Sequence, residues 1–159
     1  MKIGCIQLNM GFGKVEENYE RAEKFIREAA SQGAEIIVLP EMWNTGYALE
    51  KLDELADVNG ERTRAFLSSL SKELGVHIVG GSVSVKRDDK FYNTMYTFNK
   101  DGELVGEYSK AHLFRLMDEH LYLEAGSEMN RFALGDIEAA GVICYDIRFP
   151  EWLRSHALA

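Results

Sequence analysis

The spacing of apolar residues alternates between helical and extended along this chain, and this alternation limits its possible folds more than any other feature. In residues 15–32, apolar side chains recur every three or four positions, as on one face of a helix, and residues 61–74 repeat the pattern. Residues 2–8, 34–39 and 76–83 are short apolar runs of the length typical of buried strands. Helices and strands that alternate in this way predict a layered α/β fold.

The pattern becomes antiparallel in the second half of the chain. Residues 91–99 and 103–108 flank a short loop with the pair Asp101-Gly102, and such a pair between two extended runs indicates a hairpin. Residues 131–134 and 137–144 are predicted to form two further strands. The whole of this half is therefore predicted to extend a sheet rather than to form a helical bundle.

Two long loops separate the predicted elements. The first follows Pro40 and the second covers 109–129, and connections of that length inside a compact domain are usually functional. Pro150 is suited to the first turn of a closing helix. Because no repeat, low-complexity tract or linker interrupts the chain, residues 1–159 are predicted to form one domain.

Composition excludes several classes of function. The net charge of -8 argues against non-specific binding of nucleic acid, which needs a basic face. No apolar run approaches the ~20 residues of a membrane span, and the N-terminus lacks the features of a signal peptide, so a cytoplasmic protein without a membrane partner is predicted. Two cysteines are too few for a disulfide framework, and Cys5, between Gly4 and Ile6, is predicted to be a small buried side chain.

Three reactive side chains, Glu41, Lys110 and Cys144, each stand at or just beyond the end of a predicted strand. Strand ends in layered α/β sheets are where side chains from distant parts of the sequence converge on a crevice. A carboxylate, an ammonium and a thiol there supply a base, an electrophile and a nucleophile. Each of them can also be interpreted as an ordinary loop residue or a structural thiol, and no spacing rule joins the three into one site.

Three segments resemble the motifs of the nitrilase superfamily of carbon–nitrogen hydrolases. Residues 141–151, GVICYDIRFPE, resemble the nucleophile motif of that family. Residues 37–41, IVLPE, resemble its general-base motif, and residues 108–114, YSKAHLF, resemble its lysine motif. The three occur in the family's order and with similar separations, and the resemblance covers essentially the whole chain.

The resemblance implies an α-β-β-α sandwich in which Glu41, Lys110 and Cys144 form the catalytic triad. Cys144 then attacks an amide carbonyl, Glu41 takes the thiol proton and delivers it to the departing ammonia, and water releases the acid from a thioester. Lys110 and the main-chain N–H of Tyr145 stabilise the oxyanion. No metal or organic cofactor is needed in this cycle.

The resemblance also implies supporting residues near the triad. A second glutamate commonly follows the family lysine and orients it or the substrate, and Glu119 is the candidate, with Asp118 as its competitor and an exposed loop acid as the alternative. Arg148 is positioned in the motif to pair with a substrate carboxylate, although a structural ion pair is the favoured interpretation.

The histidines do not predict a metal site, because His112 and His120 lack a second ligand pair at a recognised spacing. A protease-like pair of Cys144 and His112 is conceivable, but it leaves Glu41 and Lys110 unexplained.

Residues 110–126 look most like ω-amidases, which deaminate small 2-oxo-acid amides such as 2-oxoglutaramate and which in bacteria are associated with methionine salvage. N-carbamoyl amino acid amidohydrolases and nitrilases are the alternatives. Family members continue past the helix that follows the nucleophile, so the sandwich is expected to be incomplete at its C-terminal end. An inactive fragment that acts only as a folding or interaction module is therefore the competing hypothesis, and self-association into a homo-oligomer is expected in either case.

Overall fold

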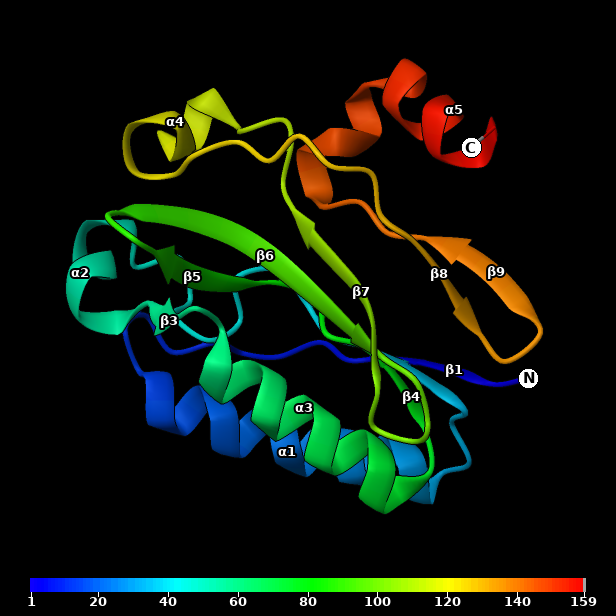
Figure 1. Cartoon of the computed structure of the whole chain (residues 1–159). Coiled ribbons are helices and arrows are strands. Elements are labelled where there is room, and N and C mark those ends of the chain that lie inside the picture. The colour runs from blue at the N-terminus through cyan, green and yellow to red at the C-terminus, as the bar shows by residue number, and fades with distance from the viewer. Residues whose placement is uncertain (159) are drawn as a thin grey trace.

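A computed structural model describes residues 1–158 of the chain (Figure 1). Its strands are β1 (Ile3–Cys5), β2 (Ile36–Val38), β3 (Asp57–Val58), β4 (His77–Val79), β5 (Val83–Arg87), β6 (Lys90–Phe98), β7 (Leu104–Ser109), β8 (Arg131–Leu134) and β9 (Ile137–Ala140). Its α-helices are α1 (Val15–Ser31), α2 (Leu52–Leu55), α3 (Glu61–Leu74), α4 (Glu119–Tyr122) and α5 (Pro150–Leu158). Short 3-10 helices are η1 (Leu49–Lys51), η2 (Arg115–Met117) and η3 (Cys144–Arg148). The mixed order of helices and strands confirms the predicted α/β class.

The first seven strands form one sheet in the order β1-β2-β4-β6-β5-β3, with β7 paired to β6. β1, β2 and β4 are parallel, whereas β6 runs antiparallel to β4, β5 and β7. β6 is the longest of these strands and makes the most pairings, so it is the element to which both halves of the sheet attach. The predicted hairpin at Asp101-Gly102 is confirmed as the connection between β6 and β7.

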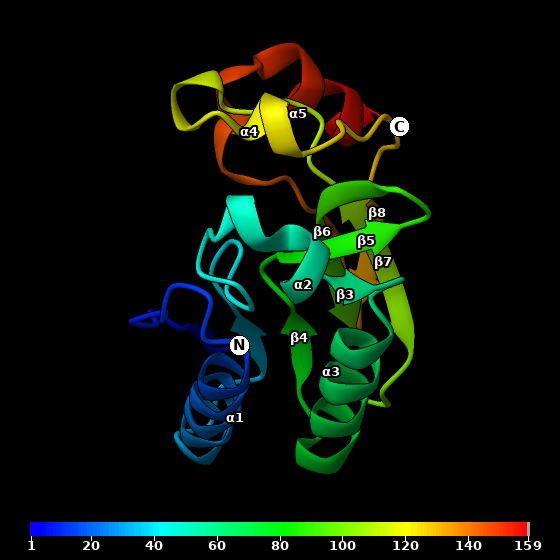
Figure 2. The same ribbon diagram turned by 90° about the vertical axis from the view of Figure 1, so that its left-hand side faces the viewer.

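Helices α1 and α3 lie side by side on one face of this sheet (Figure 2). Their apolar faces are the predicted ones: Tyr19, Ala22 and Ile26 of α1 and Leu67 and Leu70 of α3 are buried in the main core. Burial of a large aliphatic side chain such as Ile26, Leu67 or Leu70 contributes about 1.5–3 kcal/mol to stability. Helical periodicity in the sequence therefore identified the residues that attach the helix layer to the sheet.

The hairpin of β8 and β9 lies against the other face of the sheet, on the side opposite α1 and α3 (Figure 1). Phe132 and Leu134 of β8 pack there with Ile36 of β2. Helix α5 follows and places Trp152 against Met95, which belongs to the central strand β6. A helix layer, a main sheet and a second small sheet thus stack in the order expected of an α-β-β-α sandwich.

Two predicted strands were wrong in extent. The expected strand over residues 137–144 ends at Ala140, and Cys144 begins a 3-10 helix instead. The expected strand over residues 76–83 is split into β4 and β5, because the chain turns at Gly80 and Gly81. A Cβ at Gly81 would collide with the carbonyl oxygen of Pro40, and only glycine allows that close approach.

The prediction that Cys5 is buried was also wrong, since its side chain is exposed. β1 is the edge strand of the sheet, and Gly4 is the residue of β1 that faces α1. A Cβ added at Gly4 would lie only 3.2 Å from the Cβ of Ala29 in that helix. Because side chains alternate along a strand, Cys5 points to the opposite face. Within residues 1–158, no helix combines the length and the apolar character needed to cross a bilayer.

Candidate active site

Glu41 is held at the end of β2 by a turn that packs against the neighbouring strands. The N–H of Leu39 donates to the oxygen of Val79 at 3.0 Å, and the N–H of Ser82 donates to the oxygen of Pro40 at 3.1 Å. These bonds fix the backbone on the N-terminal side of Glu41. Its side chain keeps 17% exposure, so the carboxylate stays in contact with solvent at the edge of the core.

The loop after Glu41 is locked by buried hydrogen bonds. The indole N–H of Trp43 donates to the oxygen of Gly80 at 2.9 Å, and the Asn44 side chain bonds the backbone of Ser84 in both directions. The same loop holds Tyr47 at φ 65°, a left-handed conformation that is strained for an aromatic residue. The hydroxyl of Tyr47 interacts with Glu41, and burial followed by the charge of Glu41 raises the pKa of that phenol.

Lys110 lies directly beyond β7 and is completely buried. Its ammonium donates to Oε1 of Glu41 and to Oε1 of Glu119, each at 2.8 Å. Burial lowers the pKa of Lys110, but the hydrogen bonds and charges of the two carboxylates outweigh this, so the pKa is raised. The amine is therefore a permanent cation at neutral pH, as an electrophilic group for a developing oxyanion needs to be.

Glu119 begins α4 and is 1% exposed. Besides Lys110, it accepts the main-chain N–H of Phe114 at 2.7 Å through its second oxygen. Asp118, the competing candidate, is exposed and has no contact with the lysine. Glu119, and not Asp118, is therefore the acid that contacts Lys110. Because Glu119 is buried, the alternative that it is an exposed loop acid is wrong.

Cys144 stands at the start of η3 with φ 46°, again a left-handed conformation. Its side chain is exposed, as a nucleophile must be to meet a substrate. Burial of the sulfur, followed by the negative charge of Glu41, raises the pKa of the thiol, while Lys110 lowers it. The group is therefore a protonated thiol at neutral pH, and a thiol that acts as a nucleophile must first pass its proton to a base.

Asp146 anchors the turn that carries Cys144. It is fully buried, and its oxygens accept the N–H of Ile143 at 3.0 Å, the hydroxyl of Tyr108 at 2.7 Å and the N–H of His112 at 2.9 Å. The ring of His112 lies 2.7 Å from the same carboxylate. One side chain therefore ties the nucleophile turn to β7 and to the segment after Lys110.

Asp146→Ala is expected to reduce the free energy of unfolding by about 3 kcal/mol or more, because it leaves several buried donors without an acceptor. Urea denaturation monitored by circular dichroism measures this loss. The matched control is Asp136→Ala in the exposed β8–β9 turn, which is expected to change stability by no more than about 0.5 kcal/mol. Equal stability of the two variants would contradict the anchoring role.

Within residues 1–158, the structure gives Arg148 no structural ion pair and His112 no hydrogen bond to Cys144. Arg148 is exposed and forms no ion pair within residues 1–158, so the expected structural ion pair is wrong. His112 bonds Asp146 and stacks on Phe149 at 3.7 Å between ring centroids, and the charge that raises the pKa of Cys144 is that of Glu41. Tyr145 follows Cys144 directly, with its ring 4.9 Å from that of Phe114.

Sequence reasoning did not identify Tyr47 or Asn93 as neighbours of Glu41. Asn93 of β6 is fully buried and donates from Nδ2 to Oε1 of Glu41 at 2.9 Å. It occurs in none of the three motifs, and Thr94 and Thr97 of the same strand are buried polar residues too, so polarity within β6 did not single it out.

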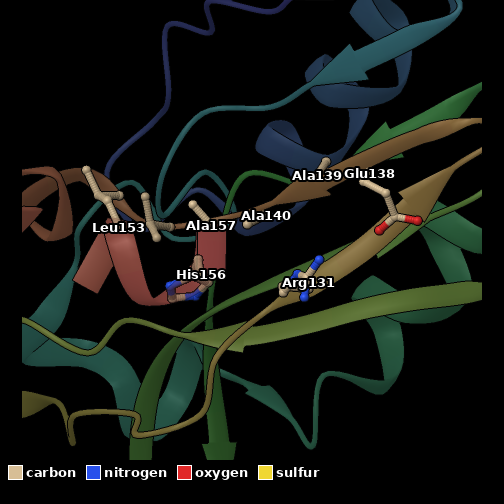
Figure 3. A pocket seen from close by; sticks show the side chains of 8 residues that line it. Arg131, Glu138, Ala139, Ala140, Leu153, His156 and Ala157 are labelled. Carbon is tan, nitrogen blue, oxygen red and sulfur yellow. The ribbon is translucent and has the colours of Figure 1, made fainter. Parts of the chain in front are cut away.

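The hollow in Figure 3 lies elsewhere, between the β8–β9 hairpin and α5. Arg131 and Glu138 of the hairpin and Leu153 and His156 of α5 line it, and it contains none of the three reactive side chains. Within residues 1–158, no group of three or more His, Cys, Asp or Glu side chains is arranged to hold a metal ion.

Comparison with known proteins gives consistent results at the level of family, sequence and fold. The family model described as carbon-nitrogen hydrolase matches residues 2–159. A 2-oxoglutaramate amidase from Bacillus subtilis is 53% identical over 154 residues, which make up 97% of this chain and 59% of that protein. An omega-amidase from Homo sapiens is 36% identical over 98% of this chain and 59% of its own length.

The fold is similar to the crystal structure of Saccharomyces cerevisiae Nit3, a protein described as a member of branch 10 of the nitrilase superfamily. The TM-score is 0.88 at 28% identity, over 99% of this chain and 60% of that one. The chain therefore spans about three fifths of the length of each of these relatives.

Proposed function

Because the chain belongs to the carbon-nitrogen hydrolase family, we propose that it hydrolyses the amide bond of a small substrate through a thioester on Cys144 and releases ammonia. The observation that carries this proposal is the position of Glu41 beside both other reactive groups. Its carboxylate accepts a hydrogen bond from the Lys110 ammonium at 2.8 Å, and its negative charge raises the pKa of the Cys144 thiol. A base, a cation and a nucleophile grouped in this way are what acyl transfer from an amide requires.

In the first half of the proposed reaction, Glu41 takes the proton from the Cys144 thiol while the sulfur attacks the carbonyl carbon. The negative charge that develops on the carbonyl oxygen is stabilised by Lys110 and by the main-chain N–H of Tyr145. Glu41 then gives its proton to the amide nitrogen, because an amide nitrogen leaves only when it is protonated. The C–N bond breaks, ammonia departs and a thioester remains on the sulfur.

In the second half, Glu41 takes a proton from a water molecule that attacks the thioester. A second tetrahedral intermediate forms with the same stabilisation of its oxyanion. The C–S bond then breaks, the sulfur recovers the proton from Glu41, and the carboxylic acid leaves. Glu119 supports both halves, because it holds the other side of the Lys110 ammonium at 2.8 Å.

The proposed substrate class is a small 2-oxo-acid amide such as 2-oxoglutaramate. Support comes from the two relatives, one named as a 2-oxoglutaramate amidase and one as an omega-amidase. Arg148 is a candidate partner for a substrate carboxylate, since it is exposed four residues after Cys144 and has no ion pair within residues 1–158. The proposal extends to a cytoplasmic homo-oligomer with a role in methionine salvage, without nucleic-acid or membrane partners.

Ammonia release from a panel of substrates tests the substrate class. We expect the highest kcat/KM for 2-oxoglutaramate, compared with an aliphatic nitrile and an N-carbamoyl amino acid at matched chain length. A preference for either of the other two compounds would refute the ω-amidase assignment. A folded protein that releases no ammonia from any amide would instead support the alternative of a folding or interaction module, and light scattering on the same sample gives its oligomeric state.

A further inference from the structure

Asn93 bonds the carboxylate of Glu41 and the backbone of Lys110, although it belongs to none of the three motifs. It lies within β6, and its side chain is fully buried. Its Nδ2 donates to Oε1 of Glu41 at 2.9 Å, and its main-chain oxygen accepts the N–H of Lys110 at 2.9 Å. One residue of the central strand therefore holds the base through its side chain and the lysine through its backbone.

The orientation of the Asn93 side-chain amide gives its nitrogen a hydrogen-bond partner but gives its oxygen none among the described residues. Within residues 1–158, Oδ1 of Asn93 is buried without a hydrogen-bond partner. Buried polar atoms without partners are costly and rare, and in native proteins they often mark functional sites. Turning the amide over would place Oδ1 against the Glu41 carboxylate, where two acceptors repel each other. The side chain is therefore fixed by the hydrogen bond that it gives to Glu41.

We infer that Asn93 is a positioning residue for the general base: together with Lys110 it fixes Oε1 of Glu41 and leaves Oε2 to exchange the proton with Cys144. The two nitrogen donors reach the same oxygen, at 2.9 Å and 2.8 Å. No nitrogen donor within residues 1–158 reaches Oε2. The inference rests on the proposed amidase function, in which Glu41 moves that proton in both halves of the reaction.

Asn93 differs from the other groups around Glu41 in being neutral. The other polar or charged side chains that face Glu41 come from four different segments: Lys110, Glu119, Tyr47 and Cys144. Removing Asn93 leaves all of these charges in place and removes only a donor that favours the ionised carboxylate. The base must be ionised to act, so the acidic limb of the pH–rate profile should move to higher pH.

The test is steady-state ammonia release by the full chain and by three variants across pH. Asn93→Ala is expected to lower kcat about 10–100-fold, the worth of one hydrogen bond to a charged group, with little change in KM. Its acidic limb should move to higher pH. Asn93→Asp should lose more, because it places a second carboxylate against Glu41. Unchanged kcat and an unmoved limb in Asn93→Ala would refute the positioning role.

Thr97→Val is the matched control. Thr97 lies in the same strand, is fully buried, and has a hydroxyl without a partner within residues 1–158. Its replacement by the isosteric valine should leave both kcat and the pH profile at the parent values. A purely structural role of β6 polar residues predicts instead that both variants lose stability and that neither changes the pH profile. If Asn93→Ala does not fold, Asn93→Ser replaces it, since the shorter hydroxyl cannot reach Glu41.

A second measurement separates failure of this inference from failure of the proposed function. Alkylation of Cys144 by iodoacetamide needs no substrate, and a Cys5→Ser background removes the other exposed thiol. Glu41 raises the pKa of the Cys144 thiol, so a displaced Glu41 should move the alkylation profile of Asn93→Ala to lower pH. If the parent releases no ammonia but the alkylation profile of Asn93→Ala still moves to lower pH, the amidase proposal is refuted and the Asn93–Glu41 contact is supported. If the parent is active but its alkylation profile coincides with that of Asn93→Ala, only the inference about Asn93 is refuted.

Discussion

Cys144→Ala is expected to lower ammonia release at least about 10⁴-fold, because the sulfur is the only group proposed to bond to the carbonyl carbon. Without it, neither the tetrahedral intermediate nor the thioester forms. The side chain is exposed and lies in a strained turn that Asp146 holds, so its truncation removes little packing. Ammonia release under substrate saturation, with circular dichroism to confirm the fold, measures the effect.

The control for this experiment is Cys5→Ser. Cys5 is the other exposed cysteine of the chain, and it lies on the edge strand β1, remote in the sheet order from β6 and β7. We expect this variant to retain the parent activity. Mass spectrometry should also detect an acyl adduct on the parent and on Cys5→Ser but not on Cys144→Ala. Comparable turnover by Cys144→Ala would eliminate the thioester mechanism.

Glu41→Gln is expected to change turnover and thiol reactivity in opposite directions. Turnover should fall about 10²–10⁴-fold, because glutamine cannot take the thiol proton or protonate the leaving nitrogen. The thiol should become more reactive at neutral pH. Burial and then the charge of Glu41 raise the pKa of the Cys144 thiol, and Lys110 lowers it. The neutral amide removes the contribution of Glu41 and leaves those of burial and Lys110.

Iodoacetamide alkylation between pH 6 and pH 10, in the Cys5→Ser background, provides the second measurement. We expect the midpoint of the Glu41→Gln profile to lie at lower pH than that of the parent. Glu50→Gln, a change at an exposed glutamate of η1, is the matched control and should leave both turnover and alkylation unchanged. A Glu41→Gln midpoint at higher pH would mean that the carboxylate does not contact the thiol in solution.

Local patterns in the sequence predicted the helix layer well. The expected helices over 15–32 and 61–74 match α1 and α3, and most of the expected apolar positions are buried or partly buried, with Phe25 as the exposed exception. Helical periodicity reports which residues share a face, and that property depends only on neighbours within a few turns. The hairpin at Asp101-Gly102 was predictable for the same reason, because its turn is encoded in two adjacent residues.

Strand boundaries were less predictable, since they depend on pairing with distant segments. The apolar residues 141–143 continue the pattern of β9, yet they form no strand, and Asp146 accepts the N–H of Ile143 instead of a sheet partner. The split between β4 and β5 has a similar origin, because Gly81 turns the chain where Pro40 packs against it. In both places a contact from outside the segment decides its conformation.

The candidate site also has features that local patterns predict and features that depend on contacts between distant segments. The sequence by itself determined the α/β class and the helix layer, and its motifs singled out three candidate reactive side chains, because motifs and periodicity are contained in adjacent residues. Only the tertiary structure decided that Glu119 rather than Asp118 holds Lys110, that Asn93 joins the base, and that Arg148 forms no ion pair within residues 1–158. Asn93 and Glu41 lie 52 positions apart, and their contact depends on the register of β6, which a local pattern does not contain.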